Sequence, residues 1–248
     1  MAAVAIENLT VAYERRPAIH HLSGRFAAGS LTAIVGPNGA GKTTLIKAIA
    51  GLLPIESGNI GLNGLARADI AYLQQQTEID RRFPIVLRDV VGFGHWAGLG
   101  AFGGLTASHR AALNAAIAAV GLSGFESRPV ATLSAGQFQR ALFARIVLQD
   151  AKLILLDEPF NGIDARTVVE LIGILHAWHG QGRTVLCVTH DFDIVRRHFP
   201  ETLLLARRPV AWGATAVALT DDNLARSRGM AEAWESDAAA CAPAGIAA

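Results

Sequence analysis

The segment GPNGAGKTT, residues 36–44, matches the phosphate-binding pattern G-x-x-x-x-G-K-[ST]. The apolar run Leu31–Val35 precedes it and is typical of a buried strand. Residues Leu45–Ala50 follow it and are typical of a helix that ends at Gly51. A strand, a glycine-rich loop and a helix start in this order predict a phosphate site, because glycines let backbone N–H groups approach the anion and the helix N-terminus is positive.

The loop also supplies side chains for a nucleotide and its metal ion. Lys42 can reach the β- and γ-phosphates, and the hydroxyl of Thr43 can ligate Mg²⁺. The predicted nucleotide contacts in this segment are Asn38, Gly39, Ala40, Gly41, Lys42, Thr43 and Thr44. A chance match to the pattern is disfavoured, because the expected strand and helix flank it.

Length, net charge and cysteine content limit what the chain can be. Its 248 residues suffice for one large domain, and its net charge of +1 gives no reason to expect a nucleic-acid partner. Two cysteines, Cys187 and Cys241, cannot form a disulfide framework, so a reducing cytosolic setting is expected. The N-terminus does not resemble a signal peptide, and no segment is a convincing membrane span.

Apolar runs and turn residues give a coarse secondary structure. Strands are predicted at 4–13, 19–27, 31–35, 69–74, 152–157 and 184–189, and helices at 45–50, 106–120, 137–149 and 167–176. The turn-rich stretch 54–63 suggests short antiparallel strands, and 77–104 shows little periodicity. The alanine-rich residues 231–248 are expected to form a disordered tail.

Two carboxylates follow the most continuous apolar strand. Asp157 and Glu158 come at its carboxyl end, which is where parallel sheets collect their ligands. Asp157 is placed to hold Mg²⁺, and Glu158 could polarise an attacking water. The alternative is an ordinary strand exit capped by acids, which the nearby phosphate loop disfavours.

A second strand exit presents a histidine. Residues 185–188 are apolar and lead through Thr189 to His190, which could contact the γ-phosphate. A lone histidine more often has a structural role. Here its position after a buried strand favours a chemical role.

A second helix start follows Leu133. The sequence Leu133-Ser134-Ala135-Gly136-Gln137 opens the predicted helix 137–149 with small residues, which is again typical of an anion-binding end. The simpler interpretation is an N-cap at Ser134 with a flexible glycine.

Together these motifs resemble the ATP-binding cassette family, the motor subunits of ABC transporters, over roughly residues 3–215. The family order is present: phosphate loop, signature, Walker B strand, D-loop and switch histidine. The resemblance assigns these motifs to Gly36–Thr43, Leu133–Gln137, Asp157-Glu158, Asn161–Asp164 and His190. Tyr13 falls where the family stacks an aromatic ring on adenine, although a core role is equally open.

The resemblance implies a P-loop NTPase core with a mostly parallel sheet, an N-terminal antiparallel β subdomain and a helical signature subdomain. It implies one ATPase domain over residues 1–230, with the Q-loop and helical subdomain at about 77–148. Two copies would bind Mg²⁺-ATP between them. Each copy's phosphate loop would face the partner's Ser134, Ala135, Gly136 and Gln137. Glu158 and His190 would be the catalytic residues, and Thr43, Gln75 and Asp157 the Mg²⁺ ligands.

Three positions depart from the family pattern or leave it open. Ala135 replaces the usual first glycine of the signature, and alanine disfavours a positive φ. Asn161 stands in the D-loop where serine or alanine is more usual. The Q-loop glutamine matches Gln75 best, while Gln74 and Gln76 remain possible.

The stretch Ile79–Val91 resembles the branch that drives zinc and manganese importers. Iron or siderophore importers are the alternative, followed by a soluble ABC ATPase. The expected partners are a second copy, transmembrane permease subunits and, indirectly, an extracytoplasmic substrate-binding protein. The expected location is the cytoplasmic face of the inner membrane, attached through the permease.

Overall fold

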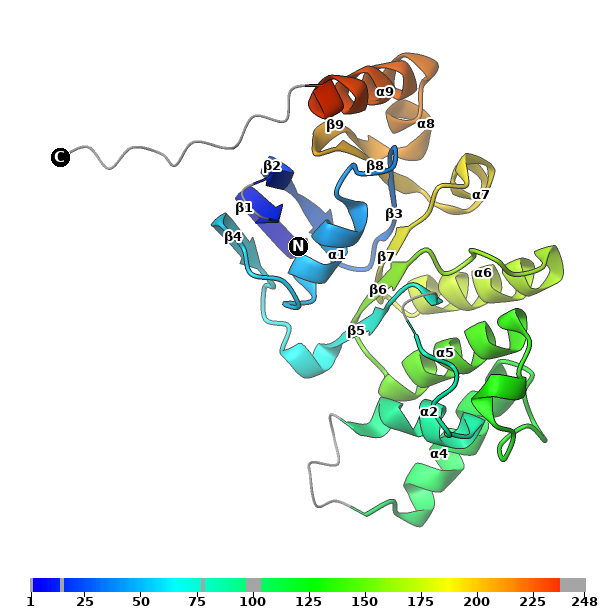
Figure 1. Cartoon of the computed structure of the whole chain (residues 1–248). Helices are drawn as coiled ribbons and strands as arrows, with labels where there is room; N and C mark the ends of the chain where they lie inside the picture. The colour runs from blue at the N-terminus through cyan, green and yellow to red at the C-terminus, as the bar shows by residue number, and fades with distance from the viewer. Residues whose placement is uncertain (1, 14–15, 77–78, 97–103, 237–248) are drawn as a thin grey trace. The chain divides into compact units, whose positions relative to one another are not determined.

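The computed structural model describes residues 2–13, 16–76, 79–96 and 104–236 (Figure 1). The chain divides into two compact units. We name them the phosphate-loop unit, comprising 1–28, 32–63 and 188–248, and the signature unit, comprising 29–31 and 64–187.

The phosphate-loop unit contains an antiparallel sheet of three strands (Figure 1). Its central strand β1 (Ala2–Tyr13) pairs with β2 (Arg16–Ala27) on one side and β4 (Ser57–Gly61) on the other. The N-terminal strand pair was predicted correctly. The turn-rich stretch 54–63 supplies only one strand, because its partner is the distant β1.

The same unit contains the strand that leads into the phosphate loop. Every residue of β3 (Leu31–Val35) is buried, as expected for a strand covered on both faces. It pairs in parallel with β8 (Glu201–Ala206), which pairs antiparallel with β9 (Arg208–Ala214). These last two strands were not predicted from the sequence.

Four helices complete the described part of the phosphate-loop unit. They are α1 (Lys42–Ile49), α7 (Phe192–His198), α8 (Thr215–Ala218) and α9 (Asp221–Ser236). Helix α9 runs six residues into 231–248, so 231–236 is helical where a disordered tail was predicted. The rest of that predicted tail lies outside the described residues.

In the signature unit, strands neighbour one another in the order β5 (Ile70–Leu73), β6 (Leu153–Asp157) and β7 (Thr184–Val188). Strands β5 and β6 are parallel. Helix α6 (Ala165–Gly180) connects β6 to β7, and it is longer at both ends than the predicted 167–176. With the sheets of the first unit, this arrangement confirms the predicted α/β class with mostly parallel strands.

Three helices of the signature unit pack on one another: α2 (Leu87–Gly92), α4 (Ala107–Ala119) and α5 (Ala135–Gln149) (Figure 1). Thr106 caps α4, because its hydroxyl accepts a bond of 3.3 Å from the N–H of His109. The predicted helices 106–120 and 137–149 are therefore present, and α5 begins two residues earlier than expected.

The segment 77–104, which shows little periodicity in the sequence, is helical in part of its described residues. Helix α2 is followed directly by a 3₁₀ turn, Phe93–His95. Gly94 explains the close approach to α5, because a Cβ there would lie 2.5 Å from the carbonyl oxygen of Arg145. Short helices of this kind are stabilised by tertiary packing and therefore leave little periodicity in the sequence.

No helix within the described ranges is both long enough and apolar enough to cross a bilayer.

Candidate active site

The phosphate loop adopts the backbone that its glycines permit. Gly39 and Gly41 have φ angles of +72° and +91°, and Gly41 forms the N-cap of α1. A Cβ on Gly41 would lie 2.3 Å from the carbonyl oxygen of Ala18, so a larger residue does not fit there. At Gly39, no heavy atom of the described residues lies within 4 Å of a Cβ, apart from Gly39 and its two chain neighbours, so the loop leaves open space at this point.

Lys42 lies folded over the loop that precedes it. Its Nζ donates to the carbonyl oxygens of Gly36 and Pro37, both at 2.9 Å, and the residue is only 7% exposed. The ammonium group is thereby held above a glycine loop and a helix N-terminus. This combination of positive groups with open space fits a triphosphate chain.

His190 lies in the same compact unit as the phosphate loop. The N–H of Thr189 donates to the carbonyl of Ile34 at 3.3 Å, so His190 lies level with the end of β3. His190 is exposed, and the next residue, Asp191, caps α7 by accepting from two backbone N–H groups. The phosphate-loop unit therefore contains both the lysine and the histidine that the sequence singled out.

Tyr13 ends strand β1 in the same unit. Its side chain is 49% exposed, which argues against the core role that the sequence left open. An exposed aromatic ring can stack on a planar base.

In the signature unit, the glutamines and the acidic pair meet at one sheet edge. Leu73 of β5 is level with Leu156 of β6 in a parallel register. Gln74 and Gln75 therefore leave β5 at the edge where Asp157 ends β6 and Glu158 follows it. Amide and carboxylate oxygens of this kind are the ligands that a hard cation such as Mg²⁺ prefers.

Gln76 is directed elsewhere. Its Nε2 donates to the carbonyl oxygen of Ala135 at 2.9 Å. This bond holds the amide nitrogen of Gln76 at the signature turn, which favours Gln74 or Gln75 over Gln76 as the predicted Mg²⁺ ligand.

Glu158 has an uncommon backbone conformation. Its φ angle is +47°, in the left-handed region that non-glycine residues rarely adopt. Such strained residues cluster at functional sites, because the surrounding structure must hold them in place. The amide of Asn161 donates to Oε2 of Glu158 at 3.4 Å, so the unusual D-loop residue contacts the predicted catalytic carboxylate.

Cys187 lies on β7 and is fully buried. Burial raises the pKa of its thiol well above the usual range, and the nearby negative charges of Asp157 and Glu158 raise it further. The thiol therefore stays protonated at neutral pH and behaves as a small apolar side chain.

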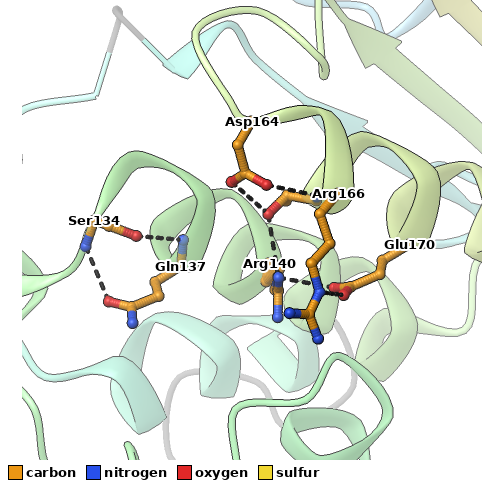
Figure 2. A network of polar contacts seen from close by, with 7 residues as sticks. Ser134, Gln137, Arg140, Asp164, Arg166 and Glu170 are labelled. Carbon is orange, nitrogen blue, oxygen red and sulfur yellow. Dashed lines mark hydrogen bonds and ion pairs between the residues drawn. The ribbon is translucent and has the colours of Figure 1, made fainter.

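The signature residues form a capping box at the start of α5. Oγ of Ser134 accepts from the N–H of Gln137 at 3.1 Å, and Oε1 of Gln137 accepts from the N–H of Ser134 at 3.0 Å (Figure 2). The N-cap interpretation is thus correct, and it does not compete with phosphate binding, because the serine O–H can still donate.

The backbone at position 135 does not require the glycine that is usual in the family. It is the first residue of α5 and is not among the residues with a positive φ. The concern raised by the sequence, that alanine would strain this position, is therefore resolved.

The D-loop residue Asp164 is tied to the following helix. It caps α6 by accepting from the N–H of Thr167 at 2.9 Å and from its hydroxyl at 2.8 Å. These bonds hold the pKa of Asp164 below its usual value, and the bond from the backbone N–H has the larger effect.

A polar network joins α5 to α6 and was missed by sequence reasoning. Nη2 of Arg140 donates to the hydroxyl of Thr167 at 3.1 Å and forms an ion pair of 2.8 Å with Glu170 (Figure 2). Glu170 also pairs with Arg166 at 3.3 Å. No short-range sequence signal connects Arg140 to Glu170, because the contact arises only when the two helices pack.

These observations define a nucleotide-binding protein of the P-loop class, with a second helix start that is capped by Ser134. Residues 19–161 match the family model described as ABC transporter. The chain belongs to this family, whose ATP-binding subunits hydrolyse ATP.

Its relatives include metal transport proteins. It is 39% identical to the zinc transport system ATP-binding protein TroB of Treponema pallidum, over 92% of this chain and 87% of TroB. It is 37% identical to the manganese transport system ATP-binding protein MntB of Bacillus subtilis, over 92% of this chain and 93% of MntB.

Solved structures agree with this fold. A chain of an ABC transporter assigned to the metal-chelate type, in an inward-facing conformation, has a TM-score of 0.82 at 26% identity, covering 92% of this chain and 90% of that one. A nucleotide-free ATP-binding cassette has a TM-score of 0.79 at 19% identity, over 92% and 99% of the two chains, and supports the fold alone.

Proposed function

We propose that this chain is the ATP-hydrolysing motor subunit of a bacterial importer for zinc or manganese. The similarity to TroB and MntB over nine-tenths of the chain supports this cargo class. The geometry at the two helix starts supports the nucleotide chemistry.

The nucleotide is bound chiefly by the phosphate loop. Backbone N–H groups of Asn38 to Thr44 hold the phosphates, Lys42 neutralises their charge, and Tyr13 stacks on adenine. Thr43, Gln75 and Asp157 supply the oxygens that would hold Mg²⁺. When bound, this ion offsets the negative charge of the triphosphate.

One observation carries the mechanism: each unit contains its own helix start suited to phosphate, at Gly41 and at Ser134. Two copies packed head to tail would place the Ser134 turn of one copy against the triphosphate on the other. Ser134 and Gly136 then clamp the γ-phosphate, Glu158 orients the attacking water, and His190 stabilises the developing charge.

This role requires partners beyond a second copy. Transmembrane permease subunits would use the closure of the dimer, and an extracytoplasmic binding protein would deliver the cargo. The chain would then lie at the cytoplasmic face of the inner membrane, held there by the permease.

Glu158→Gln tests the catalytic assignment. The amide cannot accept a proton, so we expect ATP turnover to fall by about a hundredfold or more while ATP still binds. With ATP, this variant should form a stable dimer by light scattering, and Glu158→Gln with Ser134→Arg should not, because the larger cation would block the turn. Undiminished hydrolysis in Glu158→Gln would contradict the proposal.

The cargo is tested by growth. A strain lacking this chain should grow poorly when zinc or manganese is limiting, and the wild-type gene should restore growth where the Glu158→Gln gene does not. Iron or siderophore import is the second candidate, favoured by the likeness to a metal-chelate type transporter. A defect confined to iron limitation would support that alternative.

A further inference from the structure

Two side chains of the segment after β5 reach the signature turn. Nε2 of Gln76 donates to the carbonyl oxygen of Ala135, and Nη2 of Arg81 donates to the carbonyl oxygen of Leu133. These carbonyls flank Ser134 on both sides. The turn that presents Ser134 is therefore held by residues 59 and 52 positions earlier than the carbonyls they contact.

The guanidinium of Arg81 is enclosed by the start of α5. Besides Leu133, it donates to the carbonyl of Val130 at 3.4 Å, and its Cζ lies 5.0 Å from the ring centroid of Phe138. Phe138 is 1% exposed, so the ring is a fixed platform. A planar cation over an aromatic face with two carbonyl acceptors leaves the Leu133 backbone little freedom.

Stability alone does not explain an arginine at this position. Nε of Arg81 is buried, and within the described ranges it has no hydrogen-bond partner. A buried donor without a partner opposes folding. Residues that oppose local stability in this way are found where function sets the requirement.

We propose that Arg81 is a positioning residue for ATP hydrolysis, which sets the backbone at Leu133 and thereby the direction of the Ser134 hydroxyl. The effect passes to the partner copy's nucleotide, so the inference rests on the proposed dimer. Arg81 itself touches neither ATP nor the reacting atoms.

The neighbouring Arg82 provides a matched control. Its side chain is 91% exposed and pairs with Asp80 at 3.1 Å. Removing Arg82 changes the net charge as removing Arg81 does, but it leaves the signature turn untouched. Methionine is the substitution of choice, because its unbranched apolar chain replaces the aliphatic part of arginine and can contact an aromatic ring, while it removes every donor.

The first measurement is steady-state hydrolysis. We expect kcat/KM of Arg81→Met to fall about tenfold or more, since hydrogen bonds from a charged donor are lost at Leu133. Arg82→Met should stay within about twofold of wild type. Binding of a fluorescent ATP analogue to the chain's own phosphate loop, at concentrations too low for dimers, should be unchanged in both variants.

Thermal unfolding separates positioning from simple structural support. The melting temperature of Arg81→Met should stay within about 5 °C of wild type. Removing the buried Nε donor, which has no partner among the described residues, stabilises the fold and offsets the hydrogen bond lost at Leu133. Full turnover in Arg81→Met, or a large loss of melting temperature together with turnover, would overturn the inference.

The last measurement distinguishes this inference from the proposed function. If Glu158→Gln remains monomeric with ATP, the proposed dimer mechanism fails. If Glu158→Gln forms the dimer and Glu158→Gln with Arg81→Met forms it with equal affinity, only the role of Arg81 fails. We expect the second variant to need at least tenfold more ATP for dimer formation.

Discussion

Gly136 of the signature lies directly against Asp164 of the D-loop. A Cβ on Gly136 would stand 3.2 Å from Oδ2 of Asp164 and 3.1 Å from the hydroxyl oxygen of Thr167. The start of α5 and the start of α6 are therefore in close contact, and glycine is what permits it. The signature and the D-loop of one copy are accordingly packed against each other.

Gly136→Ala should disturb both motifs together. The added methyl must displace the Asp164 cap by a few tenths of an ångström, so we expect kcat/KM for ATP to fall by about tenfold and the free energy of unfolding by about 1 kcal/mol. Ala135→Gly is the control, because position 135 is helical and needs no glycine. It should retain turnover, and a loss in the control as large as that in Gly136→Ala would contradict the prediction.

The ion pair between Arg140 and Glu170 should couple α5 to α6. Their side chains are 21% and 40% exposed, so solvent screens the pair only in part. A double-mutant cycle with Arg140→Met and Glu170→Gln, followed by urea unfolding, should give a coupling energy of about 1 kcal/mol. The same cycle with Arg166→Met, whose side chain is 88% exposed, should give less. Equal coupling energies in the two cycles would contradict this prediction.

The cap at Asp164 should depend on pH. Its pKa is lowered by the hydrogen bonds from the backbone and hydroxyl of Thr167. A carboxyl with a depressed folded-state pKa contributes stability above its ordinary value of about 4, and that contribution is lost as the pH falls through the folded-state pKa. Asp164→Asn keeps an acceptor oxygen but does not titrate. Its free energy of unfolding should therefore be lower than that of wild type at pH 7, and the difference should shrink as the pH falls to 3. Urea unfolding at several pH values measures this, and a constant deficit would contradict it.

The phosphate loop should tolerate alanine at Gly39 better than at Gly41. Both positions have a positive φ, which costs an L-residue about 1 kcal/mol or more. At Gly41 the methyl would also meet the carbonyl of Ala18 at 2.3 Å, whereas at Gly39 the space is open. Thermal unfolding should therefore show a larger loss for Gly41→Ala. A larger loss at Gly39 would indicate a different loop conformation.

Several local features could be predicted because they depend on neighbouring residues. The continuous apolar runs of β3, β6 and β7 are recognisable, since a strand buried on both faces has no polar side. The capping box at Ser134 and the phosphate loop are short patterns with local hydrogen bonds. Their order along the chain was enough to predict the family.

Other features could not be predicted because they depend on distant parts of the chain. The helix Leu87–Gly92 forms in a glycine-rich region because α5 covers its apolar side chains. The left-handed conformation of Glu158 is imposed on a residue type that does not favour it. No local sequence pattern predicts either of these two features.

The sequence by itself determined the fold class, the phosphate loop and the order of the motifs, since these follow from local periodicity, glycine conformations and helix caps. Only the tertiary structure decided which side chains hold the motifs in place. Gln76 and Arg81 at the signature carbonyls, and Arg140 at Glu170, meet because separate elements pack together. Contacts of such long sequence separation depend on the packed core as a whole, and no short segment encodes them.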